Sequence, residues 1–391
     1  MLLFDGTSLT KEWLQGVLEN KFGLRPEIDS FGLISEASHG YMSQIRRVRL
    51  SWPSPSSSLP SSVVVKAPAV GSAADAWVAA SGGGADAEKL RKAKEAMAKV
   101  QALCHSIEHF VYSLFQKGTP VSSPKIYATF GMEEENPAIV MEDISNAHTL
   151  DVVQGFSERQ LYMLVDQLVN LHVYSFTNKE WKKGKYHEDD KDIAFSLLDT
   201  TSKFARNLIE LNPEWKSLAA LEKNVLSSSD WFFDYYDKYE EPDRLAVLAH
   251  GDLWAPQFLW RGEGEKETLA AIVDWQLCHS ASVAEDILRL LVFGVDSAER
   301  KRLTRPLLQY YFSQLSLRLP DNKIAVPFTF DVLLEEYKSI LPYVCGMTLF
   351  ALGMWSNSPV LKDGIRDEER VAEMTDRARG VIDEVAEAYG W

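Results

Sequence analysis

One stretch of the chain, Leu245–Gln276, concentrates residue types that could carry chemistry. A first apolar run ends at a His-Gly-Asp tripeptide (250–252), and Gln257 follows five positions after that aspartate. A second apolar run, Leu269–Val273, ends at Asp274. If the two runs are strands that end side by side, they hold two carboxylates and an amide together. Such groups can accept a hydroxyl proton and bind Mg²⁺, as phosphoryl transfer requires. Two ordinary hairpin strands followed by aspartates in turns would give the same pattern.

The spacing from His250 through Gln257 to Asp274 resembles the protein-kinase pattern of a catalytic loop followed by a metal-binding aspartate. The longer matches, HGDLWxxQxLW, IVDWQ and AEDILRL, resemble the CHK-kinase-like branch of the aminoglycoside/choline kinase superfamily, which includes ecdysteroid-kinase-like proteins. The resemblance covers most of the chain, and the block 250–276 is its specific part. One position departs from the family pattern, because Gln257 stands where the family usually has Asn.

The resemblance implies a role for each residue of this block. Asp252 would be the catalytic base, in one catalytic motif with His250, while Gln257 and Asp274 would bind Mg²⁺. The implied reaction moves the γ-phosphate of ATP to a hydroxyl of a small molecule. Family members phosphorylate choline-like, aminoglycoside-like or steroid hydroxyls. The many aromatic side chains of this acidic chain suit a cation and a sterol equally, so the sequence leaves the acceptor open.

The nucleotide-binding residues are expected upstream. Lys66 ends the β-branched run Val63–Val65 and is the candidate for the lysine that contacts the α- and β-phosphates. A solvated lysine at a strand end would look the same. The resemblance implies a glycine-rich turn, G-x-G-x-G-F-x-S, over the phosphates at positions 36–43. Of its three glycines only Gly40 remains, and the turn ends at Ser43, so these two residues are the implied contacts.

Two interpretations compete for His105, Glu108 and His109. Read as H-x-x-E-H on a helix, the two histidines share one face and would bind zinc, with the glutamate as the base of a metallopeptidase. Read through the family resemblance, Glu108 belongs to an HNxExxF-type helix and pairs with Lys66, as a kinase glutamate does. The second interpretation is favoured, because three fixed positions in five arise easily by chance.

The sequence also predicts how these residues are divided between lobes. Strands are expected at 124–129 and 138–141, and the resemblance implies that backbone groups of Met141 to Asp143 form a hinge that meets adenine. We therefore expect a two-lobed, protein-kinase-like α+β fold. Its N-terminal nucleotide-binding lobe (1–143) would hold a small antiparallel sheet and one helix. Its larger, mainly helical lobe (144–391) would bind the acceptor.

Local signals predict several individual elements. Thr10 is expected to cap an opening amphipathic helix, and Ser157 with Gln160 forms a capping box at the start of another. His172, at the end of the apolar stripe of that second helix, is expected to be structural. Trp181–Asp192 is predicted to be a charged surface loop.

The Ala/Gly-rich composition of Gly71–Lys99 predicts an exposed insertion that leads into a helix. No G-K-[ST] follows its glycines, which excludes a Walker A loop.

Composition limits the partners and the compartment. The 391 residues include 41 Lys+Arg and 56 Asp+Glu, a net charge of −15, which argues against nucleic acid and anionic membranes as partners. Three widely spaced cysteines do not form a disulfide framework, so a reducing compartment is expected. The first residues show no basic region followed by an apolar one, so no signal peptide is expected. The apolar window Ile340–Trp355 is interrupted by Pro and Gly, so it predicts a buried helix. We expect a cytoplasmic protein. The oligomeric state is not indicated.

The alternative from another class is a nucleotide-binding pseudokinase that acts as a binding module. Gln257 and the glycine-poor turn support it. The presence of Lys66, Asp252 and Asp274 together favours the active enzyme. A protein kinase is less favoured, because no A-P-E segment follows Asp274.

Overall fold

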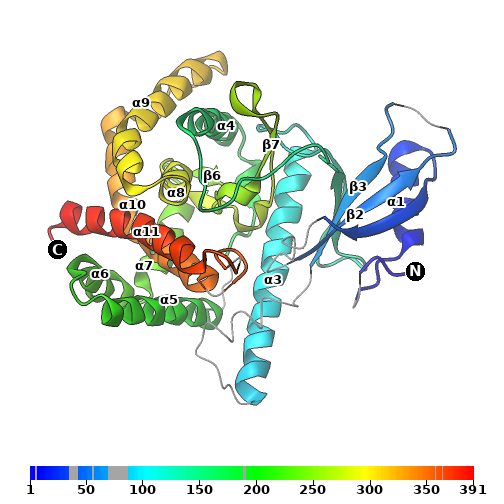
Figure 1. Cartoon of the computed structure of the whole chain (residues 1–391). Coiled ribbons are helices and arrows are strands. Elements are labelled where there is room, and N and C mark those ends of the chain that lie inside the picture. The colour runs from blue at the N-terminus through cyan, green and yellow to red at the C-terminus, as the bar shows by residue number, and fades with distance from the viewer. Residues whose placement is uncertain are drawn as a thin grey trace. The chain divides into compact units, whose positions relative to one another are not determined.

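The computed structural model describes residues 1–4, 7–34, 43–54, 57–68, 87–187, 191–356, 358–362 and 364–391. The chain forms two compact units (Figure 1). Unit 1 comprises Met1–Ala147 and Leu259–Gln276, and unit 2 comprises His148–Phe258 and Leu277–Trp391. Unit 1 holds an antiparallel sheet and unit 2 is mainly helical, so the chain has the two-lobed, protein-kinase-like α+β fold that the sequence predicts.

The segment Leu259–Gln276 groups with unit 1, although the predicted boundary at 143/144 assigned it to the C-terminal lobe. Two contacts explain the difference. The Ile272 amide donates to the Ser122 carbonyl at 2.9 Å, and the Asp274 carboxylate binds Lys66. The chain therefore leaves unit 1 after residue 147 and later returns to it.

Five strands form the main sheet of unit 1, in the order β1-β2-β3-β5-β4, and every neighbouring pair is antiparallel. They are β1 (Glu27–Leu33), β2 (Ser43–Ser51), β3 (Ser62–Pro68), β4 (Ile126–Phe130) and β5 (Ala138–Glu142). Its helices are α1 (Lys11–Phe22) and α3 (Ala87–Phe115), and the returning segment contributes β7 (Phe258–Arg261), η5 (Gly264–Lys266), β8 (Thr268–Ile272) and η6 (Trp275–Leu277).

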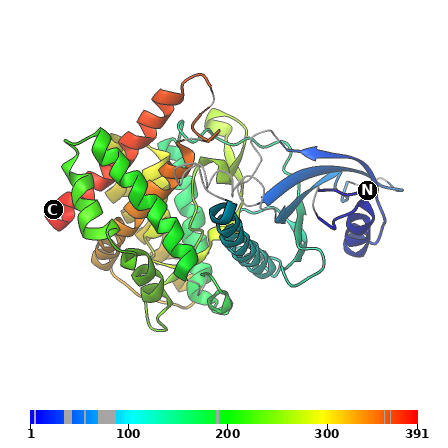
Figure 2. The same ribbon diagram turned by 90° about the horizontal axis from the view of Figure 1, so that it is seen from below.

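Side chains on the two faces of β3 pack against two different helices. Val63, Val65 and Ala67 join an apolar core with Leu14 and Leu18 of α1. The residues between them point to the opposite face because the strand has a period of two. That face meets α3, and Figure 2 shows α1 and α3 on opposite sides of the sheet. Both faces of β3 are thus covered, so a polar residue on it is buried.

Helix α1 begins as predicted. The Thr10 hydroxyl accepts a hydrogen bond from the Trp13 amide at 3.1 Å, which satisfies one of the free N–H groups of the first turn. The predicted insertion divides into two parts. Residues 71–86 lie outside the described residues, whereas 87–99 already belong to α3.

Eight α-helices make up most of the described part of unit 2. They are α4 (Glu158–Thr177), α5 (Lys191–Leu211), α6 (Lys216–Leu221), α7 (Asp230–Glu240), α8 (Glu285–Gly294), α9 (Ser297–Asp321), α10 (Phe330–Trp355) and α11 (Asp367–Tyr389). Shorter elements are η2 (Glu180–Lys183), the π-helical η3 (Glu222–Leu226), η4 (Ala255–Gln257), β6 (Val247–Ala249) and β9 (His279–Ala281). Helix α8 packs against α4, α9, α10 and α11, and all its residues are buried.

The strands that precede the two candidate aspartates do not pair with each other, contrary to the prediction. Strand β6, before Asp252, pairs with β9, and β8, before Asp274, pairs with β7. The reason for the second pairing is proximity in sequence, because a short turn makes β7 and β8 a local hairpin. Each aspartate is therefore positioned by its own two-stranded sheet.

The capping box of Ser157 and Gln160 is present at the start of α4. The prediction of a surface loop from Trp181 onward is wrong for Trp181 itself, which is not on the surface. Its indole is fully buried and donates to the Ser175 carbonyl at 3.0 Å, because the adjoining η2 turn folds it back under α4.

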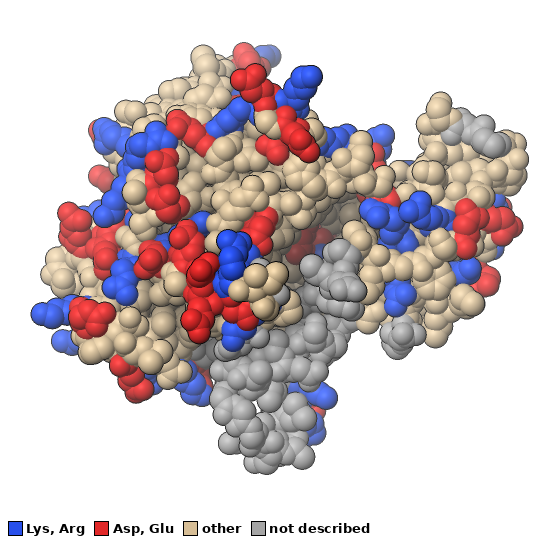
Figure 3. All heavy atoms as spheres, viewed as in Figure 1, with Lys and Arg blue, Asp and Glu red and all other residues tan. Residues whose placement is uncertain are grey.

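Helix α10 contains the apolar window Ile340–Trp355, and most of that window is buried, as predicted. Within the described ranges, no helix combines the length and the apolar character needed to cross a membrane. On the face drawn in Figure 3, acidic and basic side chains lie interspersed over the helices of unit 2.

His172 provides a stability test of unit 2. Its ring is buried, Nδ1 lies 2.7 Å from the Tyr311 hydroxyl, and burial lowers its pKa from 6.5 to about 3. The folded state therefore favours the neutral ring. This contribution is complete above pH 6.5 and is lost as the pH falls from 6.5 towards 3, by about 2 kcal/mol at pH 5. Urea unfolding at pH 7 and pH 5 should show a smaller loss in His172→Gln than in wild type.

The exposed His148 supplies the control for this experiment, because His148→Gln should keep the wild-type pH dependence. An equal loss in the His172→Gln and wild-type proteins would contradict the assignment of a buried neutral ring.

Candidate functional site

Three predicted residues meet in unit 1. The Lys66 ammonium lies 2.6 Å from a Glu108 carboxylate oxygen and 2.5 Å from Oδ1 of Asp274. The Lys66 and Glu108 side chains are only 6% and 1% exposed, whereas that of Asp274 is 25% exposed. Lys66 is therefore not a solvated strand-end lysine. It lies on the α3 face of β3 and joins a carboxylate of α3 to one that follows β8.

Burial and charge oppose each other in this cluster. Burial alone would lower the pKa of Lys66, but the carboxylates of Asp274 and Glu108 outweigh it and hold that pKa above its usual value. Burial raises the pKa of Glu108 from 4.5 to about 7, although Lys66 opposes the rise. Lys66 thus stays charged at physiological pH. Glu108, its less exposed partner, has a pKa close to that pH.

The backbone at Asp274 is in the left-handed region, with φ 68°. Only a few per cent of residues other than glycine adopt it, Asp and Asn most readily, at a cost of about 1–2 kcal/mol. Neighbouring side chains hold this conformation. The buried Trp275 packs edge-on against Phe115 of α3 at 4.8 Å, and the Gln276 amide donates to Oδ2 of Asp274 at 3.3 Å. Strain fixed in this way is typical of functional sites.

The histidines beside Glu108 bind the sheet of unit 1. His105 Nε2 lies 2.8 Å from the Phe130 carbonyl, and His109 Nδ1 lies 2.9 Å from the Thr129 hydroxyl. Burial lowers the pKa of His105 to about 4. Among the residues that the structure describes, no three His, Cys, Asp or Glu side chains are grouped to hold a metal ion. Since all three residues of the H-x-x-E-H pattern have other partners, the arrangement favours the kinase interpretation over the zinc one.

The predicted hinge is built into the sheet. Met141 pairs with Val64 of β3 on one side and Ile126 of β4 on the other. The Asp143 carboxylate accepts hydrogen bonds from Arg47 at 2.7 and 3.0 Å and from the Ser62 hydroxyl at 2.6 Å. Its side chain is therefore structural, and a contact of the hinge backbone with adenine stays a prediction.

The predicted glycine-rich turn lies almost entirely outside the described residues, including Gly40. Its last residue, Ser43, is buried at the start of β2 opposite Pro68.

In unit 2, the His-Gly-Asp tripeptide forms a tight turn after β6. Gly251 has φ 77°, and a Cβ at this position would lie 2.3 Å from the Leu277 carbonyl and 2.8 Å from His279. Glycine is needed here both for its backbone conformation and for the close approach of the neighbouring strand. The tripeptide is thus dictated partly by packing against β9.

Asp286 of α8 anchors this turn. Its two carboxylate oxygens accept the His250 amide at 2.7 Å and the Gly251 amide at 3.0 Å. The ring of the buried His250 accepts the Asp252 amide at 3.3 Å through Nδ1. Burial raises the pKa of Asp286 to about 6, while the two amides oppose the rise. His250 therefore acts on the backbone of the turn, as a positioning residue.

A second buried charged group, centred on Glu285, lies next to Asp286 in α8. Glu285 accepts hydrogen bonds from His279 Nε2 at 3.0 Å, from Arg289 Nε at 3.0 Å and from the Tyr235 hydroxyl. Despite its burial, these partners lower its pKa to about 2. His279 places Nδ1 2.9 Å from the Leu277 carbonyl, so both ring nitrogens face acceptors. Burial opposes charge on the ring, but Glu285 raises the pKa of His279, and a protonated ring fits both contacts.

Gln257, at the end of η4, contacts the candidate base. Its amide nitrogen donates to Oδ2 of Asp252 at 3.2 Å. The family usually has Asn at this position, and Asn is one methylene shorter. The hydrogen bond to Asp252 therefore depends on the presence of Gln257. The side chain of Gln257 therefore orients the Asp252 carboxylate, whether or not its oxygen binds a metal.

The structure thus brings the predicted residues together in two groups. Lys66, Glu108 and Asp274 meet in unit 1, and His250, Asp252 and Gln257 meet in unit 2. The sequence did not identify the supports of the second group, which are Asp286, Glu285, Arg289, His279 and Tyr235. A usable signal was present, because three charged residues fall within the apolar run of α8, where burial requires partners.

Comparisons with known proteins identify the family of the chain. A family model described as "DUF1679: Uncharacterized oxidoreductase dhs-27" matches residues 19–390, so the chain belongs to this family. The "Uncharacterized oxidoreductase dhs-27" of Caenorhabditis elegans is 24% identical over 239 residues. That match covers 58% of this chain but only 29% of the relative.

An uncharacterised kinase-like protein of Caenorhabditis elegans is 26% identical over 279 residues, which cover 68% of this chain and 71% of that protein. The family match and this relative confirm the resemblance found in the sequence.

The GDP complex of wild-type aminoglycoside 2'-phosphotransferase-IIIa aligns with TM-score 0.47 and 13% identity, covering 96% of this chain and 99% of that chain. The ethanolamine kinase of Plasmodium vivax aligns with TM-score 0.43 and 13% identity, covering 90% and 81% respectively. Both scores are below 0.5, so the fold assignment rests on the chain's own sheet and helices.

The cluster of unit 1 predicts a large effect of Lys66→Met. This change leaves the Glu108 and Asp274 carboxylates without their shared cation and should destabilise the protein by about 3–5 kcal/mol at pH 8. The deficit relative to wild type should shrink towards pH 5.5, because Glu108 is then protonated in both proteins. Urea unfolding at the two pH values measures it.

Adding Glu108→Gln to Lys66→Met should restore part of this stability, because the buried charge is removed as well. The exposed Lys117 gives the matched control, Lys117→Met, with little change expected. A Lys66→Met protein as stable as this control would show that the cluster is not a compensated buried pair.

Proposed function

We propose that the protein is a phosphotransferase that uses ATP and Mg²⁺ and moves the γ-phosphate to a hydroxyl of a small molecule. The observation that carries the proposal is the buried Lys66–Glu108 pair joined to Asp274, whose backbone is held in a strained conformation. A lysine fixed between two carboxylates suits phosphate binding, because it is charged and preorganised. The name of the kinase-like relative supports the same class of reaction.

On the nucleotide side, Lys66 would pair with phosphate oxygens while Glu108 holds its ammonium in place. The pairing with Glu108 limits the rotamer freedom of the lysine, so less entropy is lost when the phosphate binds. In this proposal Asp274 turns its partly exposed carboxylate towards the nucleotide. Backbone groups at Met141 to Asp143 would meet adenine, and Ser43 would approach the phosphates.

On the acceptor side, Asp252 would act as the base. The acceptor oxygen forms a bond to the γ-phosphorus, and the bond from that phosphorus to the β–γ bridging oxygen breaks. The hydroxyl proton passes to the Asp252 carboxylate, and ADP leaves. The amide of Gln257 orients this carboxylate, and Asp286 fixes the turn that presents it.

The donor set suits magnesium. Mg²⁺ prefers oxygen ligands and is usually bound through one or two carboxylates together with substrate phosphates. Asp274 would supply a carboxylate and Gln257 an amide oxygen. When bound, the ion supplies charge neutralisation at the phosphate oxygens.

The oxidoreductase name stands in the family description and on a relative of which this chain matches only 29%. Both are called uncharacterized, so the name is a weaker guide to function than the site. A second candidate is a pseudokinase that binds nucleotide without turnover. It is favoured by the hydrogen bond from Gln257 to Asp252, because the amide holds an oxygen of the proposed base.

The Asp252→Asn variant tests the proposed reaction. Asn keeps the shape of the side chain but cannot accept the proton, so kcat should fall about 10²–10⁴-fold while ATP affinity changes little. The measurement is ATP turnover on an acceptor that wild type phosphorylates, found in a library of hydroxyl-bearing metabolites. The exposed Asp243 supplies the control, Asp243→Asn, with wild-type turnover expected. Full activity of Asp252→Asn would exclude Asp252 as the base.

The Gln257→Asn variant separates the enzyme from the pseudokinase. If Gln257 already supports catalysis through its contact with Asp252, the shorter Asn should leave turnover equal or reduce it severalfold. If the longer side chain blocks the base, Asn should raise turnover instead. Wild type inactive on every acceptor, with activity gained in Gln257→Asn, would identify the protein as a pseudokinase.

A further inference from the structure

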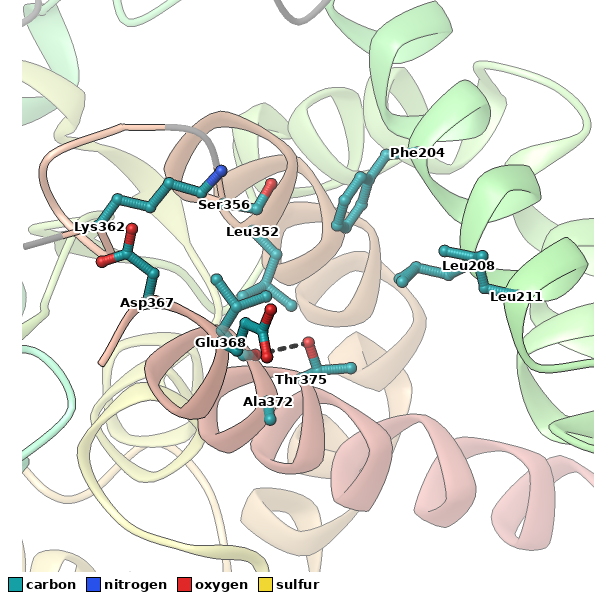
Figure 4. Close-up of a pocket in the computed structure, with 11 residues that line it drawn as sticks. Phe204, Leu208, Leu211, Leu352, Ser356, Lys362, Asp367, Glu368, Ala372 and Thr375 are labelled. Atoms are coloured by element: carbon teal, nitrogen blue, oxygen red, sulfur yellow. Dashed lines mark hydrogen bonds between the residues drawn. The ribbon is translucent and has the colours of Figure 1, made fainter. Parts of the chain in front are cut away.

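Charged side chains of unit 2 differ in how far water reaches them. The depression between α5, α10 and α11 is lined by Lys362, Asp367 and Glu368 among apolar side chains (Figure 4). Lys362 and Glu368 are exposed, so water screens their charges and they select no particular ligand. His279 of β9 is buried, and protein groups alone must stabilise a charge on its ring. The partners of this ring therefore indicate what it does.

Both nitrogens of the His279 ring face acceptors. Nδ1 lies 2.9 Å from the Leu277 carbonyl oxygen, and Nε2 lies 3.0 Å from Oε2 of Glu285. A neutral ring has one N–H and one bare nitrogen, so either tautomer would set a lone pair against one of these oxygens. Only the imidazolium donates to both. The arrangement thus suits the charged form of His279.

Glu285 is held firmly as the counter-ion of this ring. Its carboxylate also accepts hydrogen bonds from Arg289 Nε at 3.0 Å and from the Tyr235 hydroxyl. Because both carboxylate oxygens have partners, Glu285 has little freedom to turn away from the ring. With Asp286, the group contains two positive and two negative side chains, so its buried charges compensate one another.

The ring also lies against the turn that carries the proposed base. A Cβ on Gly251 would lie 2.8 Å from Cε1 and Nδ1 of His279 and 2.3 Å from the Leu277 carbonyl oxygen. Gly251 directly precedes Asp252, and its amide donates to Asp286. A ring that loses a proton repels one of its two acceptors. The ring or the Leu277 carbonyl must then shift where the Gly251 backbone leaves no free space.

We propose that His279, as an imidazolium held by Glu285, is a positioning residue for the proposed base Asp252. It acts through Gly251, because the charged ring fixes the backbone of the turn and the turn aims the Asp252 carboxylate. This inference deepens the proposed function and rests on it. Its consequence is an upper pH limit of turnover that is set by a side chain remote from the substrate.

The surroundings of the ring give the direction of this pH effect. The titratable groups that face it are Glu285, Asp286 and Arg289 of α8 and Tyr235 and Tyr236 of α7. Burial lowers the pKa of His279, but the Glu285 carboxylate outweighs it and holds that pKa above 6.5. The charged ring therefore persists above pH 6.5, and its contacts are lost as the pH rises through the raised pKa.

NMR of isotopically labelled histidine nitrogens measures the charge on the ring without any need for turnover. The His279 signal, identified by its loss in His279→Gln, should titrate with a midpoint above pH 6.5. Glu285→Gln keeps the shape of the counter-ion but removes its charge, so it should lower this midpoint by about 1–3 pH units. A wild-type midpoint below 6.5, or the same midpoint in Glu285→Gln, would overturn the inference.

Steady-state kinetics tests the positioning role. The kcat of wild type should fall as the pH rises through the midpoint of His279. In His279→Gln, kcat at pH 7 should be at least tenfold lower and should lack this fall, with the KM for ATP unchanged. His279→Asn should behave alike and guards against a folding defect in the first variant. The exposed His148 gives the control, His148→Gln, which should keep the wild-type profile.

The outcomes separate this inference from the proposed function. The wild-type fall at high pH retained in both His279 variants would show a structural role only and overturn the positioning role. A neutral His279 in an active enzyme would overturn this inference alone. A charged His279 in a protein that phosphorylates no acceptor would overturn the phosphotransferase proposal, and the positioning role with it.

Discussion

Compensation of buried charge is the constraint on which both groups of candidate residues depend. A charged side chain removed from water needs partners, since the desolvation penalty otherwise exceeds what packing supplies. Helix α8 is buried along its whole length and still carries Glu285, Asp286 and Arg289. Their partners are a histidine, a tyrosine and the backbone amides of the His-Gly-Asp turn. In unit 1, Lys66 satisfies Glu108 and Asp274 in the same way.

Two left-handed backbone conformations lie beside these charges. Gly251 and Asp274 both lie in the left-handed region, one beside the proposed base and one at a proposed metal ligand. Asp286 secures the first through two amides, and the packing of Trp275 on Phe115 secures the second. Preorganisation of this kind fixes carboxylates before any ligand arrives, and phosphoryl transfer depends mainly on such positioning.

The sequence predicted what depends on neighbours along the chain. Thr10 and the capping box of α4 are local signals, and the Lys66–Glu108 pair followed from a family resemblance. The fold class was also predicted correctly. The sequence did not predict which strands pair. Strands β6 and β9 are separated in sequence by the segment Leu259–Gln276, which belongs to unit 1, so no local signal connects them. Nor did the sequence reveal the role of Asp286, which lies in the AEDILRL match but meets His250 from 36 residues away.

The most direct test of the central claim, that the Lys66–Glu108–Asp274 cluster binds a magnesium nucleotide, is a calorimetric titration of ATP with and without Mg²⁺. Wild type should bind one ATP per chain, at least tenfold more tightly with Mg²⁺. In Asp274→Asn, which keeps the side-chain shape and tolerates the left-handed backbone, this tenfold gain should disappear. ATP binding that is independent of Mg²⁺ in wild type, or a full magnesium effect in Asp274→Asn, would contradict the account.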